Sequence, residues 1–99
     1  MPKRRIIELE IFEGGDGCVA HKVGEKYKWP EDRGKICKWL QDAAGGMIRA
    51  LEHGGTLAWT YKGTPYEKLI DADGVTTEYV RCPDPTKAGL VVKITAREV

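Results

Sequence analysis

The sequence predicts a small α+β fold: a single sheet of about four strands, the last two forming a C-terminal hairpin, packed on one main helix at residues 34–53. In one long segment, apolar residues recur every three or four positions, which is typical of an amphipathic helix. In several short segments they recur every second position, which is typical of half-buried strands. A chain of 99 residues suffices for one domain but not for two, so we expect residues 1–99 to form a single domain.

Two strands are expected before the helix. Over residues 4–12, isoleucine and leucine at odd positions alternate with glutamates, which is the pattern of a strand with one buried face. A glycine-rich loop follows. A short second strand then passes through Tyr27 and Trp29 and ends at Pro30, because proline cannot donate a hydrogen bond to a neighbouring strand.

The main helix is expected over residues 34–53 because its apolar residues fall on one face of a helix with 3.6 residues per turn. That face contains Ile36, Trp39, Leu40, Ala43, Met47, Ala50 and Leu51. The pair Gly45-Gly46 costs roughly 2 kcal/mol relative to two alanines, so it predicts a bend or a split, or another element packed close against the backbone, with a bend favoured. His53 closes the helix, where the negative end of the helix dipole favours a protonated imidazole.

The last third of the chain is expected to contain a brief helix and a hairpin. Thr64-Pro-Tyr-Glu has the form of a capping box with proline at the first helical position, which predicts a short helix over residues 65–70. Residues 75–81 are rich in β-branched and aromatic residues and predict a strand. The final strand begins at Leu90 and alternates clearly, and the short loop before it favours a hairpin.

Composition excludes some classes of partner. Sixteen basic and fifteen acidic residues leave a net charge of +1, so we expect neither nucleic acid nor an anionic membrane as a partner. No run approaches the ~18 apolar residues of a membrane span. Three cysteines, an odd number, without an export signal favour the reducing cytoplasm over a disulfide framework.

The three cysteines and two histidines are the chain's soft ligands and nucleophiles. Cys18 and His21 form a Cys-x2-His pair in the glycine-rich loop, Cys37 lies in the first turn of the main helix, and Cys82 follows a strand. Such element ends can converge in a domain with one sheet and one helix. If they do, the four residues form a Cys3His set that suits tetrahedral zinc. An iron–sulfur centre fits less well, because three thiolates would leave one position to His21 or a partner.

A second hypothesis makes Cys37 a reactive thiol. The positive end of the helix dipole and the neighbouring lysines favour its thiolate, and His21 would serve as the base. Such a thiolate would attack an electrophilic substrate or exchange disulfides with Cys18 or Cys82. The enzyme version of this hypothesis places an organic substrate in a pocket lined by Trp59 and Tyr61, with Asp84 orienting a histidine.

A third hypothesis gives the cysteines no chemistry. Free cysteine is among the most buried residue types and often packs as a small apolar side chain. The chain would then be an interaction module that binds a protein partner or a second copy of itself.

Five short motifs occur in order along nearly the whole chain. They are Cys18…His-Lys-Val-Gly-Glu, Gly-Lys-Ile-Cys-Lys-Trp, His-Gly-Gly-Thr-Leu-Ala-Trp, Cys-Pro-Asp-Pro and a final Val-Val-Lys-Ile. This ordered set resembles a family of short uncharacterised bacterial proteins, many from anaerobes. The resemblance implies the same residue types at Cys18, His21, Cys37 and Cys82, with Lys38 where relatives often have proline. It implies no established reaction, cofactor or partner.

The sequence therefore predicts a small cytoplasmic protein whose Cys/His cluster is a metal-binding centre, with zinc as the favoured ion, or a redox centre. An accessory role beside a larger enzyme suits its size. The small enzyme and the interaction module stay open as alternatives, so the sequence does not decide whether the chain is a catalyst.

Overall fold

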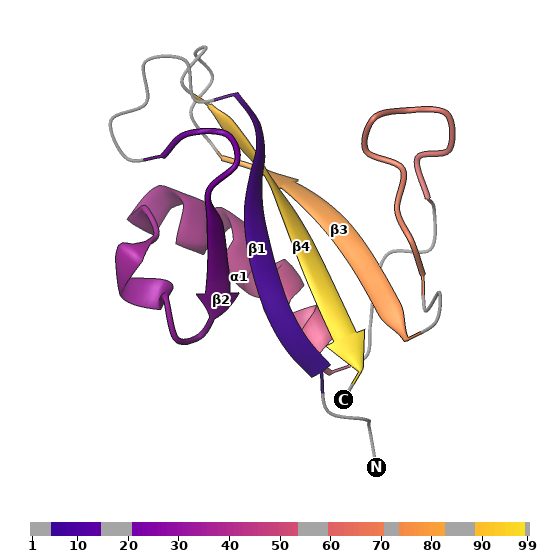
Figure 1. Cartoon of the computed structure of the whole chain (residues 1–99), viewed down its shortest axis with the longest axis horizontal. Helices are drawn as coiled ribbons and strands as arrows, with labels where there is room; N and C mark the ends of the chain where they lie inside the picture. Colours follow the sequence, from indigo (N-terminus) through magenta and orange to yellow (C-terminus); the bar gives the residue numbers. More distant parts are fainter. Residues whose placement is uncertain (1–4, 15–20, 54–59, 71–73, 83–88, 99) are drawn as a thin grey trace.

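The structure, a computed structural model, describes residues 5–14, 21–53, 60–70, 74–82 and 89–98 (Figure 1). This part of the chain contains four strands and one α-helix, α1 (Lys38–Glu52), which a short 3-10 helix, η1 (Arg33–Lys35), precedes. The strands are β1 (Arg5–Gly14), β2 (Lys26–Trp29), β3 (Val75–Arg81) and β4 (Leu90–Glu98). The expected α+β fold, with about four strands and one main helix, is confirmed. No helix of the described residues is long and apolar enough to cross a membrane.

The strands form one antiparallel sheet in the order β2-β1-β4-β3. The first and last strands of the chain therefore lie side by side in the middle of the sheet, and β2 and β3 form its edges. The pairing of β3 with β4 confirms the expected hairpin partners. The helix α1 packs across one face of the sheet, against β1, β3 and β4 (Figure 1).

The core lies between α1 and this face of the sheet. On β1, the alternation places Ile7, Leu9 and Ile11 toward the helix, and each is at most 3% exposed. Their partners on β4 share that face, because directly paired residues point to the same side of a sheet. These partners are Ala96, Ile94 and Val92. The helix contributes Leu40, Ala44, Ile48 and Leu51.

The apolar stripe of the helix is rotated relative to the expected one, and the helix begins later. Trp39, expected in the core, is 60% exposed, because the buried positions follow Leu40 at steps of three and four and leave Trp39 pointing outward. The expected break at Gly45-Gly46 is also wrong as a split, since α1 runs unbroken through both glycines. Cys37 is the N-cap residue rather than part of the first turn.

Residues 65–70 do not form the expected helix. They run as turns and extended chain along the outer edge of β3, where the Thr77 amide donates to the Leu69 carbonyl at 2.9 Å. The Leu69 amide in turn donates to the Thr77 hydroxyl, also at 2.9 Å. The capping pattern does operate locally, because the Tyr66 amide donates to the Thr64 hydroxyl. Pairing with β3 replaces the helix after that turn.

A buried ion pair fixes this segment to the sheet. The Lys68 ammonium donates to the Glu78 carboxylate at 2.8 Å, and the two side chains are 0% and 1% exposed. The second Glu78 oxygen accepts the Tyr79 amide at 3.0 Å. Glu78 pairs with Ile94 and so lies on the helix-facing side of β3. A charge at such a site needs its partner, because an unpaired buried charge is strongly destabilising.

The two helix glycines provide a first test of the fold. A Cβ at Gly45 or Gly46 would meet no atom within 4 Å outside the helix's own backbone, as far as the described residues show. Alanine there should raise the free energy of unfolding by about 0.5–1 kcal/mol at each site, because alanine loses less entropy in a helix. Urea unfolding measures the gain. At Gly14 the same change should be severely destabilising, since a Cβ would overlap the Gly89 carbonyl oxygen; equal effects at both places would contradict this packing.

The buried pair provides a second test. Lys68→Met should lower the free energy of unfolding by about 3–5 kcal/mol, because it leaves the Glu78 carboxylate buried without its cation. The double variant Lys68→Met/Glu78→Met should recover most of that loss, which urea unfolding of the three proteins would reveal. Lys38→Met is the matched control, because the Lys38–Asp42 pair is 82% and 63% exposed and such pairs contribute at most about 1 kcal/mol. If Lys68→Met lowered the free energy of unfolding no more than Lys38→Met does, the proposed contribution of the buried ion pair would be contradicted.

Candidate functional site

Three of the soft side chains, those of His21, Cys37 and Cys82, belong to segments that meet toward one end of the sheet, whereas His53 lies at the other end. At this end β1 finishes at Gly14, which pairs with Leu90 at the start of β4, and the Cys82 amide donates to the Leu90 carbonyl at 2.7 Å. The turn that carries His21 is tied to the last part of β1, because the Gly24 amide donates to the Ile11 carbonyl. Cys37 is then held to this end through His21.

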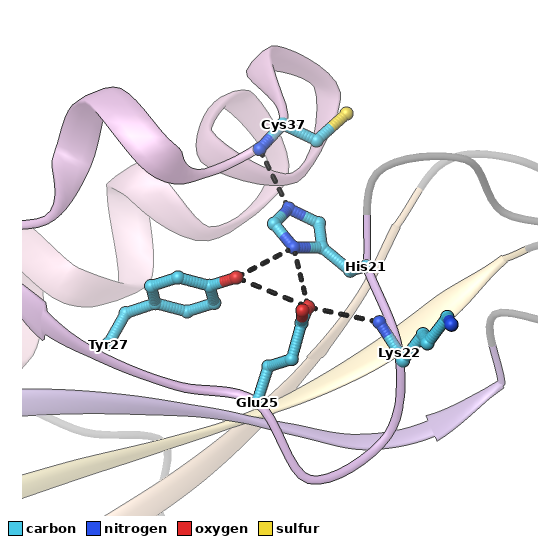
Figure 2. A network of polar contacts seen from close by, with 5 residues as sticks. All are labelled: His21, Lys22, Glu25, Tyr27 and Cys37. Atoms are coloured by element: carbon cyan, nitrogen blue, oxygen red, sulfur yellow. Dashed lines mark hydrogen bonds and ion pairs between the residues drawn. The ribbon is translucent and has the colours of Figure 1, made fainter.

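His21 is the centre of a polar network (Figure 2). It is 2% exposed, and its Nε2 accepts a hydrogen bond from the backbone amide of Cys37 at 2.9 Å. Its Nδ1 lies 3.1 Å from a Glu25 carboxylate oxygen and 3.2 Å from the Tyr27 hydroxyl. An amide can only donate, so the imidazole is neutral, with its proton on Nδ1 facing Glu25. Both ring nitrogens are therefore occupied.

Glu25 and Tyr27 are partners that sequence reasoning missed. The same Glu25 oxygen also accepts the Lys22 amide at 3.0 Å and the Tyr27 hydroxyl at 3.1 Å. The Lys22 amide is the main cause that holds the pKa of Glu25 below its usual value, and the bonds from His21 and Tyr27 add to it. Burial and the Glu25 carboxylate raise the pKa of Tyr27. The available signal was proximity, since all four residues lie between positions 21 and 27.

Cys37 combines a fixed backbone with a side chain that packs against the edge of the core and forms no capping hydrogen bond. The residue is the N-cap of α1, its side chain makes no capping hydrogen bond, and no acidic residue occupies the first turn. The residue is half-buried, and its thiol points away from the His21 ring (Figure 2). The contact between Cys37 and His21 thus runs through the backbone amide and not through sulfur. In this arrangement His21 positions the start of the helix, and its expected role as the base stays a prediction.

The expected four-residue metal set is only partly visible. Cys18 lies outside the described residues, and Cys82 is a free thiol that is 7% exposed within the core. Among the residues that the structure describes, no group of three or more His, Cys, Asp or Glu side chains is arranged to hold a metal ion. The complete set with Cys18 stays a prediction.

The expected substrate pocket is represented by Tyr61 alone, because Trp59 and Asp84 lie outside the described residues. Tyr61 lines a cavity of about 180 Å³ beside β3. Its other lining residues are Tyr66, Tyr79, Val80, Arg81 and Val91. Neither His21 nor Cys37 belongs to this wall, so the cavity and the His21 network are separate features.

A larger hollow of about 780 Å³ lies at the opposite end of the sheet, between the start of β1 and the end of α1. Its lining mixes basic residues such as Arg5 and Arg49 with acidic ones such as Glu8 and Glu52. The mixed charge favours no particular class of ligand.

Comparison with known proteins gives one distant similarity. The chain is 30% identical over 82 residues to tumor necrosis factor receptor superfamily member 25 of Homo sapiens, and the match covers 77% of this chain. The chain spans only 20% of that receptor's length, so the similarity assigns neither a family nor a function. No family model and no solved structure matches the chain. The resemblance to short bacterial proteins stays a prediction.

The lowered pKa of Glu25 predicts a pH-dependent contribution to stability. Ionised Glu25 is favoured in the folded state, so its contribution is complete above pH about 4.5 and is lost as the pH falls through the lower folded value. Glu25→Gln should therefore lower the urea midpoint near neutral pH, and the difference from the wild type should shrink toward pH about 3. Glu31→Gln, which removes an exposed charge in a neighbouring turn, is the control. A difference independent of pH would contradict the role of the charge.

Proposed function

We propose that the chain is a small thiol protein in which Cys37 is the reactive group, acting as a redox centre for a partner protein. The observation that carries this proposal is the state of Cys37. Its backbone is fixed by a buried histidine, while the residue is only half-buried and its side chain makes no cap bond at the N-terminus of α1.

The helix supplies the electrostatic support for a thiolate. Amide groups at the start of a helix form the positive end of its dipole, which favours a negative charge there. The lysines that sequence reasoning invoked contribute less. Lys35 is paired with Asp32 at 3.3 Å and Lys38 with Asp42 at 3.4 Å, so their charges are already partly balanced.

A redox role fits His21 better than the expected zinc role does. A histidine ligand must offer a nitrogen lone pair to the metal. The Nε2 lone pair of His21 is occupied by the Cys37 amide, and Nδ1 carries the proton that faces Glu25. A zinc ion bound through His21 would have to break one of these bonds.

Cys18 is the natural second thiol. It lies three residues before His21, so the intervening chain spans at most about 11 Å, and His21 contacts Cys37 directly. In the proposed exchange the Cys37 thiolate attacks one sulfur of a partner's disulfide and releases the other as a thiolate. The Cys18 thiolate then attacks the Cys37 sulfur, which frees the partner's second thiol and leaves a Cys18–Cys37 disulfide.

The partner is proposed to be a protein because of Trp39. This side chain is 60% exposed and lies two residues from the reactive thiol, on the first turn of α1. Exposed tryptophans are enriched among the residues that dominate protein–protein affinity. An accessory role beside a larger enzyme agrees with this placement.

A metal-binding thiolate site is the second candidate, favoured by the presence of Cys37 and Cys82 at one end of the sheet. In this version three cysteines hold zinc without His21. Elemental analysis of protein purified without an affinity tag distinguishes the two. One equivalent of zinc that Cys37→Ser abolishes would favour the metal site, and its absence together with free thiols would favour the redox site.

The redox proposal predicts a reactivity order among the cysteines. Incubated with oxidised glutathione at neutral pH, the native chain should form an intramolecular disulfide through Cys37, whereas Cys18→Ser should accumulate a Cys37–glutathione adduct. Peptide mapping by mass spectrometry identifies the modified residue. Cys82 is the internal control, because its burial should protect it until the protein unfolds. A Cys37 that reacts no faster than Cys82 would overturn the proposal.

A further inference from the structure

The outer edge of β3 has two different halves. Residues of an edge strand alternate between pairing with the neighbouring strand and facing outward. The Cys82 amide donates to the Leu90 carbonyl, so even-numbered residues of β3 pair with β4 and the backbone groups of Thr77, Tyr79 and Arg81 face outward.

The first half of this edge is closed by the chain itself. The outward amide of Thr77 donates to the Leu69 carbonyl, and the outward amide of Tyr79 donates to the Glu78 carboxylate. Lys68 fixes that carboxylate from the helix-facing side. Inward-pointing charges of this kind are a known way to prevent an edge strand from pairing with another chain.

The second half of the edge is open among the described residues. The Tyr79 carbonyl and the Arg81 amide face outward, and no described residue hydrogen-bonds to either. This stretch of backbone borders the 180 Å³ cavity, because Tyr79, Val80 and Arg81 all belong to its wall. Before Leu69, the backbone of the loop within residues 60–70 stands away from the ribbon of β3 (Figure 1), and Tyr61 and Tyr66 of this loop line the cavity.

The walls of the cavity are aromatic and held in place. Tyr79 packs against Phe12 and Tyr66 with ring centroids 5.0 and 5.6 Å away, and the Tyr66 hydroxyl donates to Glu13. Tyr61 has φ of 52°, a left-handed conformation that is uncommon outside glycine. Its ring lies 5.1 Å from the Lys68 ammonium, which orients it over the buried ion pair. Strained residues of this kind are concentrated at binding sites.

We propose that the open half of the β3 edge binds an extended peptide of a partner protein, which adds as a short strand beside Tyr79–Arg81. The Tyr79 carbonyl and the Arg81 amide supply main-chain hydrogen bonds, and the cavity takes one apolar or aromatic side chain between the tyrosines. Its volume is below the roughly 300 Å³ at which pockets begin to hold drug-sized ligands, so a single side chain is the fitting occupant.

The charge of the site selects the neighbouring residue of the peptide. Arg81 is an exposed residue of the cavity wall whose side chain interacts with the Tyr66 hydroxyl, and a guanidinium has further donors that pair well with a carboxylate. The bound peptide therefore carries an aspartate or glutamate next to the residue that enters the cavity. Cys37 is not part of this site, so the peptide-binding proposal does not depend on the proposed thiol chemistry.

A peptide library tests the proposal while the partner protein is still unidentified. Phage-displayed random heptapeptides are selected on the immobilised full chain and counter-selected on Tyr61→Gly, a variant that removes the ring while glycine accepts the left-handed backbone. The expected consensus is an apolar or aromatic residue beside an acidic one. Absence of any enrichment over Tyr61→Gly, or a basic consensus, would overturn the proposal.

The consensus peptide, labelled with fluorescein, then distinguishes strand addition from simple side-chain binding. Its affinity should fall about tenfold on Arg81→Glu and should be restored when the acidic residue of the peptide becomes lysine. N-methylation of the peptide backbone at alternate residues should abolish binding, because it removes the ladder donors. Lys26→Glu on the β2 edge is the matched charge control, and circular dichroism checks that each variant is folded. Equal binding by the N-methylated peptide or by Arg81→Glu would refute strand addition.

Discussion

The pairing of β1 with β4 is the constraint on which the rest of the structure depends. These strands come from the two ends of the described chain, and their register runs from Arg5 opposite Glu98 to Gly14 opposite Leu90. Every other element is placed relative to this pair. The helix covers it, β2 and β3 extend it on either side, and the core residues of both strands face α1. Because the centre of the sheet joins distant parts of the sequence, the edges are formed by the intervening chain.

One stretch of each edge is closed by the same device. At β2 the outward amide of Lys28 donates to the Asp32 carboxylate at 2.9 Å, and the Asp32 amide returns a bond to the Lys28 carbonyl at 2.8 Å. At β3 the outward amide of Tyr79 donates to the Glu78 carboxylate. In each case an acidic side chain, from four residues later in β2 and from the preceding residue in β3, accepts the backbone amide that a further strand would otherwise bind. The difference is burial: Asp32 is partly exposed, whereas Glu78 is buried and needs Lys68.

The strands could be predicted from the sequence because their alternation is local. Ile7, Leu9 and Ile11 alternate with polar residues, so they predict one buried face of a strand without any information about the helix. The phase of the helix was harder, because Trp39 and Leu40 are both apolar and only the sheet decides which one is buried. The prediction of a brief helix at residues 65–70 was wrong for a related reason. Its local capping signal was correct, but Lys68 is paired with a residue ten positions away, which no local pattern reveals.

The candidate site shows the same division between local and distant information. From the sequence, the ends of elements could converge and bring His21 near Cys37, and in the structure the His21 ring contacts the Cys37 backbone amide. The sequence could not tell that the contact joins a ring nitrogen to a backbone amide, because that depends on where α1 begins. Glu25 and Tyr27 lie in the same short stretch of sequence as His21. The sequence could not show that one Glu25 oxygen accepts both the Lys22 amide and the Tyr27 hydroxyl, because the turn brings these groups together.

At each end of α1 one backbone group is bonded to a side chain from the N-terminal part of the chain. Helix ends leave backbone groups without partners, and a cap residue usually supplies one with its own side chain. Here the Leu51 carbonyl near the C-terminus accepts a bond from the Arg5 guanidinium at 3.1 Å, and the amide of the N-cap donates to His21. His21 accepts the amide of the N-cap residue itself, which is a different donor from the first-turn amides that an N-cap serine or aspartate would bind. Cys37 occupies the N-cap with a side chain that packs against the core and makes no capping bond, so the fixed geometry at the start of the helix comes from the bond between its amide and His21.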